Sequence, residues 1–355
     1  MKQHWYKIMA VLILLYVFTV GMLVPLKPGI VGVQPSSVRT GQEVQLQVEG
    51  YNSHYLAGQE NMRVWLKLDD DRALAAKNIQ VVSDRDMTVD FSIPEYLPVR
   101  EKVADFTLLI DNPKDGAVAL PSAVFITQDS LDPAMGELVW PKYNATITDL
   151  SEVGSITYPF RNILSETIRN TYFHVPLWFA MILIFLGSVW YSVQYLRKSD
   201  DWSDTRAASL TKVGIFFGFL GLLTGAIWAK HTWGSYWSWD IKQNMTAIAL
   251  LIYLAYFVLR NSFEDEERRA RISAVYNIFA FTALIPLIYV IPRLTDSLHP
   301  GAGGNSAMGG EDLDNTMRMV FYPAIIGWTL LGLWINNLLT RSEMLKQKLL
   351  ERALG

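Results

Sequence analysis

The chain contains no cysteine in its 355 residues. This absence excludes disulfide bonds, a redox-active Cys-x-x-Cys pair, a cysteine-ligated iron–sulfur cluster and thioether attachment of haem through a Cys-x-x-Cys-His motif in this chain. Charged residues are also scarce, at 18% of the sequence, whereas soluble domains average roughly 25%. The net charge of -3 provides no basic field for nucleic acid. Since 51% of the residues are hydrophobic, the composition indicates a membrane protein.

Uncharged apolar runs of about 16–22 residues are long enough to cross a bilayer. They predict six spans, at residues 8–26, 175–196, 213–229, 244–259, 272–292 and 319–340. The first run follows Lys2 and Lys7 and therefore resembles a signal peptide. Its long apolar core, with no small-x-small cleavage site after it, favours an uncleaved anchor instead. Residues 1–28 are thus expected to form the first transmembrane helix.

The basic residues near the span ends predict the orientation of the chain. In a six-span topology four groups of these residues fall on one side of the membrane, and the short loops of the other side carry only Lys230, Lys242, Arg293 and Arg318, so both termini are expected in the cytoplasm. The opposite side then carries the long segment between the first two spans. The basic residues of the cytoplasmic side are Lys2, Lys7, Arg197, Lys198, Arg206, Lys212, Arg260, Arg268, Arg269, Arg271, Arg341, Lys346, Lys348 and Arg352.

The segment 29–128 alternates polar and apolar residues with period two, in QEVQLQVEG, MRVWLKL, MTVDFSI and ADFTLLI. About seven short strands at near-regular spacing predict an immunoglobulin-like β-sandwich inserted between helices 1 and 2. No catalytic constellation is visible in it, and His54 stands alone in a polar turn. Residues 129–173 are expected to form a linker that ends in a short interfacial helix. Residues 174–340 form the five-helix membrane domain, and 341–355 a cytoplasmic tail.

The turn at 228–240 is unusually aromatic. Its stretch HTWGSYWSWD places three tryptophans, a tyrosine, a histidine and Asp240 in ten positions. Tryptophan and tyrosine also gather at membrane interfaces, so an aromatic belt is one reading. The density of aromatic residues is higher than a belt requires, which favours a functional role. Asp240 also favours it, because a carboxylate at a bilayer edge is costly unless it is paired or solvated. His174 and His299 map to the same outer edge, and separate imidazoles at one depth suit a bis-imidazole metal site.

Three motifs resemble the tryptophan-rich haem-handling (WWD) family, in its cytochrome c maturation protein C branch. WAKHTWGSYWSWD resembles the signature WGxxWxWD, while IRNTYFHVPLW and LTDSLHPG resemble the two histidine motifs. The resemblance covers the first span and about residues 168–340, and it leaves the sandwich out. Two positions depart from the pattern: His231 stands where the family commonly has proline, and Tyr236 where it frequently has tryptophan.

The resemblance implies a site for haem b whose iron takes His174 and His299 as axial ligands. Tryptophan rings would form the platform under the macrocycle, and Gly234 would admit a close backbone approach. Asp240 would order the loop or contact a partner, and Arg293 or Lys242 would hold the propionates. The role of His231 is left open: it is either a surface residue or a third ligand of the iron. The implied cofactor-binding residues are His174, His299, Trp228, Trp233, Gly234, Tyr236, Trp237, Trp239, Asp240 and Arg293.

The function that the resemblance implies is haem delivery at the periplasmic face of the bacterial inner membrane during c-type cytochrome biogenesis. The receiver would be a periplasmic haem chaperone, cytochrome c maturation protein E. A small single-span protein D and the ABC-type ATPase and membrane subunits, proteins A and B, are further implied partners. The chain has neither a Walker A motif nor an obvious hydrolytic triad. It is therefore expected to be a haem-transfer, lyase-like platform rather than a conventional enzyme.

Three other functions are open from the sequence. A cytochrome c synthetase-type haem channel subunit belongs to the same family, but that branch usually has more helices. A bis-histidine electron-transfer cytochrome usually holds its ligands deep within helices, whereas these histidines lie at helix ends. An anchored periplasmic binding or sensor protein would use the β-sandwich as its working part, and that reading leaves the tryptophan-rich turn unexplained.

Overall fold

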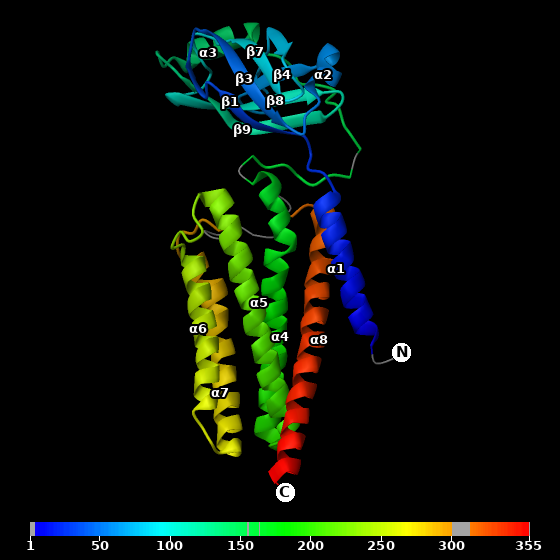
Figure 1. Ribbon diagram of the computed structural model, residues 1–355. Helices are drawn as coiled ribbons and strands as arrows, with labels where there is room; N and C mark the ends of the chain where they lie inside the picture. The colour runs from blue at the N-terminus through cyan, green and yellow to red at the C-terminus, as the bar shows by residue number, and fades with distance from the viewer. Residues whose placement is uncertain (1–3, 155, 163, 300–312, 355) are drawn as a thin grey trace. The chain divides into compact units, whose positions relative to one another are not determined.

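The computed structural model describes residues 4–154, 156–162, 164–299 and 313–354. The chain divides into two compact units. A helical unit comprises residues 1–24 and 166–355, and a β unit comprises residues 25–165. The predicted class, a helical membrane protein with a β domain inserted after the first helix, is confirmed (Figure 1).

Among the described residues, six helices are long and apolar enough to cross a membrane. All six predicted spans coincide with helices, but α5 begins well before its predicted span and α8 continues through the predicted tail. The helices are α1 (Trp5–Leu23), α4 (His174–Lys198), α5 (Asp201–Trp233), α6 (Ile241–Asn261), α7 (Glu266–Ile285) and α8 (Asn315–Leu354). After α7 the chain continues through η4 (Pro286–Val290) and η5 (Ile291–Arg293).

Aspartates define where three of these helices begin. The side chain of Asp200 accepts a hydrogen bond from the Ser203 amide, Asp240 from Lys242, and Asp265 from Arg268. Each carboxylate satisfies a backbone N–H that has no partner within its helix, and it also complements the positive end of the helix dipole. The N-cap of α6 is therefore the same Asp240 that ends the tryptophan-rich turn.

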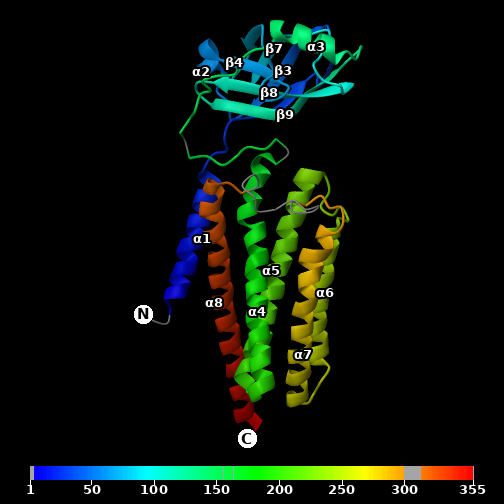
Figure 2. The same cartoon turned by 180° about the vertical axis from the view of Figure 1, so that it is seen from behind.

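The helices pack side by side, with α4 against α5, α7 and α8, and α1 against α8 (Figures 1 and 2). A buried polar cluster joins α4 to α7. Asn277 of α7 donates hydrogen bonds to Ser188 at 2.7 Å and Ser192 at 2.8 Å, and both serines lie on α4. Such bonds supply cohesion between helices where lipid removes the hydrophobic driving force. The cluster is a structural feature of the bundle, separate from the tryptophan-rich turn.

The β unit is a two-sheet sandwich of nine strands in the described residues. One sheet has the order β1-β3-β7-β6 and the other β2-β9-β8-β4-β5. This order matches the ABED and GFC sheets of immunoglobulin-type domains. The strands are β1 (Gly29–Gln34), β2 (Ser37–Arg39), β3 (Glu43–Tyr51), β4 (Arg63–Lys67), β5 (Ala73–Ala75), β6 (Asn78–Val81), β7 (Asp86–Ser92), β8 (Val103–Asn112) and β9 (Gly116–Thr127).

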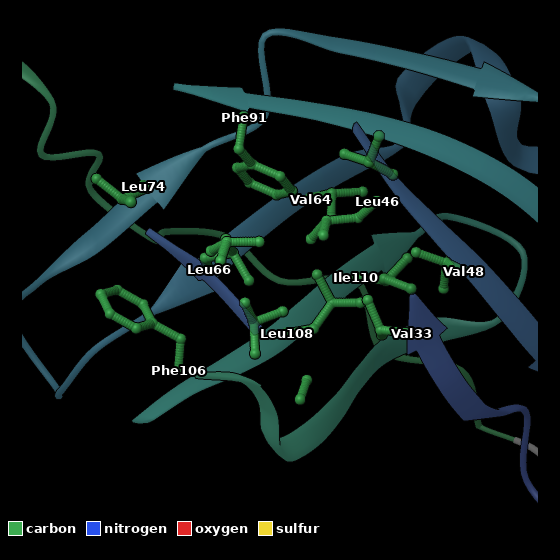
Figure 3. Close-up of a cluster of buried hydrophobic side chains, with 14 of the residues drawn as sticks. Val33, Leu46, Val48, Val64, Leu66, Leu74, Phe91, Phe106, Leu108 and Ile110 are labelled. Atoms are coloured by element: carbon green, nitrogen blue, oxygen red, sulfur yellow. The ribbon is translucent and has the colours of Figure 1, made fainter. Parts of the chain in front are cut away.

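The core of the sandwich follows from the alternation in its strands. Along β3, Leu46 and Val48 are buried while their neighbours are exposed, so alternate side chains face the second sheet. They meet Leu66 of β4 and Leu108 of β8 in the buried cluster of Figure 3. Two short helices lie in the connection between β3 and β4: α2 (Tyr55–Gly58) and η1 (Gln59–Asn61).

Residues 129–165, which the sequence predicts as a linker, pack with the sandwich. They include α3 (Pro133–Val139) and η2 (Trp140–Lys142). The buried Tyr158 exchanges backbone hydrogen bonds with Pro25 and Lys27, at 2.9 and 2.7 Å. The predicted interfacial helix is found as a 3-10 helix, η3 (Ser165–Tyr172), which leads into α4.

Candidate functional site

The tryptophan-rich turn links α5 to α6 through two left-handed residues. Gly234 has a φ of +82° and ends α5, and its carbonyl oxygen accepts a hydrogen bond from Lys230 Nζ at 2.9 Å. Trp239 has a φ of +59°, which is rare for a bulky residue. Its carbonyl oxygen is held by Asn244 Nδ2 at 2.8 Å. The turn is thus fixed by hydrogen bonds from both helices, and it delivers Asp240 to the start of α6.

Asp240 gathers the segment that carries His299. Its carboxylate accepts hydrogen bonds from the Leu298 amide at 2.7 Å, from Ser297 Oγ at 2.9 Å and from His299 Nδ1 at 2.9 Å. The Lys242 amide donates a fourth, at 2.9 Å. Asp240 is buried, at 8% relative exposure. The carboxylate therefore sets both the position of the loop and the orientation of the imidazole.

His174 is the first residue of α4, and its ring lies against α5. Its Nδ1 is 3.0 Å from the carbonyl oxygen of Gly221 and 3.1 Å from Thr224 Oγ1. A Cβ at Gly225 would stand 2.6 Å from the ring Cε1, so a glycine is required for the imidazole to lie there. The ring of Trp178, one turn further along α4, lies edge-on at a centroid distance of 6.1 Å.

These contacts fix the tautomer of both rings. A carbonyl or carboxylate oxygen only accepts hydrogen bonds, so Nδ1 carries the proton in His174 and in His299. Nε2 is then the nitrogen with the lone pair. Neither Nε2 has a hydrogen-bond partner among the residues that the structure describes. A neutral imidazole whose second nitrogen donates to a fixed acceptor is the form in which histidine binds a metal.

Electrostatics keep Asp240 charged and His299 neutral. Burial alone would raise the pKa of Asp240, but hydrogen bonds from His299, Leu298, Lys242 and Ser297 outweigh it and hold that pKa well below its usual range. Burial lowers the pKa of His299 below the usual 6.5, and the hydrogen bond to Asp240 opposes this shift without cancelling it. The pair therefore consists of an ionised carboxylate and a neutral ring.

Both imidazoles lie along one side of α5. His174 contacts Gly221 and Gly225, four residues apart, and His299 contacts Trp228, three residues further on. Residues spaced by three and four share a helix face. Three residues advance the helix by roughly 4.5 Å, so the two rings occupy successive turns. Sequence-distant histidines from α4 and from the loop after α7 are thereby brought to one place.

The aromatic residues divide into two groups. The rings of Trp228 and Trp233 lie 5.0 Å apart, and they contact His299 at centroid distances of 6.1 and 4.8 Å. Trp237 and Trp239 contact each other edge-on at 6.4 Å. Trp239 is 78% exposed and Tyr236 is 60% exposed. The predicted platform is therefore split: Trp228 and Trp233 lie against His299, whereas Tyr236 and Trp239 are exposed and Trp237 is partly buried beside Trp239.

The remaining predicted residues lie around this site with different exposure. Arg293 ends η5 and is exposed. Lys242 follows Asp240 in the first turn of α6 and is partly buried. Lys230 Nζ stands 5.8 Å from the centroid of the Tyr236 ring. His231 is exposed in the last turn of α5.

The supporting residues escaped the sequence analysis. Gly221, Thr224 and Gly225 form the wall against His174, and Ser297 fastens the segment of His299. The signal for the wall is the pair of glycines four apart in GLLTG, which marks a helix face with room for a neighbour. Ser297 had no such signal, because its role depends on Asp240, 57 residues away.

The donor set suits a metal that brings most of its own ligands. Within the described part of the chain, no group of three or more histidine, cysteine, aspartate or glutamate side chains could hold a metal ion. Two imidazoles with free lone pairs, next to two tryptophan rings, instead fit a metal already bound in a flat macrocycle such as haem.

Comparison with known proteins agrees with this chemistry. The family model for heme exporter protein C matches residues 142–354, more than half of the chain. A heme exporter protein C from Bradyrhizobium diazoefficiens is 30% identical over 51% of this chain and 68% of its own length. The protein of that name from Paracoccus denitrificans is 28% identical over 52% and 76%, respectively. That of Escherichia coli K12 is 25% identical over 51% and 71%.

Proposed function

Because this chain belongs to the heme exporter protein C family, we propose that it holds haem b between His174 and His299 and passes it to a periplasmic haem chaperone. This multi-pass membrane protein has a haem-related role in cytochrome c maturation. The observation that carries the finer proposal is the pair of Nδ1-anchored imidazoles along one side of α5. Each has its Nε2 lone pair available for iron.

The haem is cargo, and its iron offers two axial positions for imidazole. His174 and His299 fill these positions. Trp228 and Trp233 contact the macrocycle with their ring faces or edges. Arg293 and Lys242 supply the positive charge that the propionates require. Asp240 orders the loop through its hydrogen bonds to Ser297 and Leu298. Of the two roles expected for Asp240, loop ordering and contact with a partner, these bonds support the first.

The proposed orientation places this site outside the cytoplasm, in the periplasm of a bacterial inner membrane. The basic residues in the last turns of α4 and α6 and in the first turns of α5 and α7 support this side assignment. The receiver is cytochrome c maturation protein E, the chaperone that the family resemblance implies. Protein D and the ABC-type subunits A and B are the other proposed partners. They would supply the energy for release, since no Walker A motif occurs in this chain.

The test of haem binding is the visible absorption spectrum of the purified full-length protein. We expect a bis-imidazole haem spectrum in the wild type and its loss in a His174→Ala, His299→Ala double variant. A His54→Ala, His231→Ala double variant is the matched control, because both of these histidines are exposed. An unchanged spectrum in the first double variant would reject the ligand assignment.

The transfer step needs a separate test in cells. Haem loading of the chaperone is compared in cells with and without the gene, and in cells that carry the His174, His299 double variant. We expect loading only with the wild-type gene. Equal loading in all three strains would reject transfer while leaving haem binding intact.

A further inference from the structure

We infer that the two histidines are unequal ligands: His299 is the strongly donating ligand that stays on the iron, and His174 is the weaker ligand that an incoming donor displaces. This inference rests on the proposed function, since it concerns the same haem site. What carries it is a difference in hydrogen-bond acceptors. A buried carboxylate faces Nδ1 of His299, whereas neutral oxygens face Nδ1 of His174.

The bond from His299 to Asp240 is charge-assisted and shielded from water. Nδ1 and the carboxylate oxygen are 2.9 Å apart, and the Asp240 side chain is only 2% exposed. Hydrogen bonds to ionised acceptors are roughly twice as strong as those between neutral groups. By drawing the proton from Nδ1, the carboxylate raises the electron density on Nε2, which makes that nitrogen a more basic ligand.

The same carboxylate also holds the segment in place. The amide of Leu298 and the hydroxyl of Ser297 donate to it from the residues immediately before His299. The Lys242 amide ties it to α6. His299 thus lies on a loop, but its acceptor is part of a helix cap, and the loop and the ring are fastened to one point. Position and basicity both favour retention of this ligand.

Within the described residues, no carboxylate is bonded to His174. Its Nδ1 contacts the carbonyl oxygen of Gly221 and the hydroxyl oxygen of Thr224, which are both neutral. Thr224 Oγ1 can donate its own proton to the carbonyl oxygen of Leu220, 2.9 Å away, and so present a lone pair to the imidazole. These acceptors fix the tautomer without polarising the ring as a carboxylate does. His174 is well oriented but is a weaker donor to iron.

The difference assigns an order to ligand exchange. A lone pair from a donor atom of the chaperone replaces that of His174 Nε2 on the iron. The imidazole leaves as a neutral ring that keeps its Nδ1 proton, and the oxidation state of the iron is unchanged. His299 holds the haem during this step, so the cargo is bound at every stage.

Two near-isosteric substitutions test the inference on the haem-loaded, full-length protein. Asp240→Asn keeps an oxygen that accepts from Nδ1 but removes the charge, and Thr224→Val removes one of the two neutral acceptors of His174 and leaves the Gly221 carbonyl. We expect Asp240→Asn to raise the midpoint reduction potential of the haem and to weaken haem affinity by about 10–100-fold. Thr224→Val should leave both the midpoint potential and the haem affinity close to the wild-type values. Equal potentials in all three proteins would overturn the inference, because loss of loop structure alone releases haem without altering its potential.

A measurement on the wild type covers the case in which Asp240→Asn does not fold. Carbon monoxide displaces one axial histidine from ferrous haem, and the iron–histidine stretching frequency after photolysis reports the ligand that stays. We expect the high frequency typical of a carboxylate-bonded imidazole. A low frequency would overturn the unequal-ligand inference alone. A wild-type protein without a bis-imidazole spectrum would instead reject the proposed function.

Discussion

Each of the two units contains a histidine whose Nδ1 is bonded to a buried carboxylate, but the surroundings of the two rings differ. In the β unit, His54 Nδ1 is 2.8 Å from Asp115, whose side chain is 3% exposed. In the helical unit, His299 Nδ1 is 2.9 Å from Asp240, whose side chain is 2% exposed. The His54 side chain is 48% exposed, however, whereas that of His299 is 14% exposed.

The difference in exposure indicates that the His54–Asp115 pair is structural, whereas His299 is a candidate ligand. Asp115 also accepts hydrogen bonds from the His54 amide and from Asn112 Nδ2, so it fastens two turns of the sandwich together. Asp240 fastens a loop as well, but its histidine lies against the rings of Trp228 and Trp233 and beside α5, which also carries the wall of His174. In this chain the Asp240–His299 pair is accompanied by a second imidazole and by tryptophan rings, which makes His299 the candidate ligand of the two.

The largest expected effect comes from removing each carboxylate in turn. Asp240→Ala should weaken haem affinity by about 10–100-fold, because an outer hydrogen-bond partner of a metal ligand is lost. Asp115→Ala should leave haem affinity unchanged and should cost roughly 1–3 kcal/mol of sandwich stability, since buried donors lose their acceptor. Haem titration by absorbance and chemical denaturation measure the two quantities. Equal haem affinities in the two variants would contradict the assignment of the Asp240–His299 pair to the haem site and of the Asp115–His54 pair to the sandwich.

A smaller effect is expected from filling the wall behind His174. In Gly225→Ala the new methyl group would lie 2.6 Å from Cε1 of the imidazole, so the ring must shift away from α5. We expect haem affinity to fall by roughly tenfold, the lower end for a disturbed ligand shell. Gly187→Ala is the matched control, because its methyl would meet Leu210 at an ordinary 3.5 Å. The absorbance titration should show no change there. A similar loss in both variants would indicate a general effect of helix substitution.

Much of this organisation could be predicted from the sequence because its signals are local. Apolar runs predicted the six spans, and period-two alternation predicted the β domain, although it indicated about seven strands where the described residues form nine. The short strands β2 and β5 have three residues each, too few to show alternation. The prediction that His54 stands alone was wrong, because its partner Asp115 is 61 residues away.

The residues that support the candidate site could not be predicted either, because they also lie far from their partners in the sequence. The motifs pointed to His174, His299 and Asp240 separately. The hydrogen bonds that give them tautomer and orientation join residues 47 and 59 positions apart. The contacts of Trp228 and Trp233 with His299 likewise join residues far apart in the sequence. These features depend on tertiary contacts, which no periodicity encodes.

The response to pH offers a smaller, graded test. The pKa of His299 is lowered from 6.5, mainly by burial. Its neutral ring therefore stabilises the folded state fully above pH 6.5, and this contribution is lost as the pH falls through the lowered pKa. We expect His299 to remain neutral at pH 6.5, where a free imidazole is half protonated. Nitrogen NMR of the ring in the haem-free His54→Ala protein measures this. A titration midpoint at or above 6.5 would contradict enclosure of the ring.

The smallest effect is expected at His231, the histidine beside the tryptophan-rich turn. It is exposed in the last turn of α5, and it shares neither the carboxylate of His299 nor the glycine wall of His174. We expect His231→Ala to leave both the haem spectrum and the rate of chaperone loading at wild-type values. Slower loading with an intact spectrum would show instead that an exposed imidazole without an anchored Nδ1 takes part in transfer. In that case His174 and His299 would hold the haem, and the exposed His231 would take part in its release.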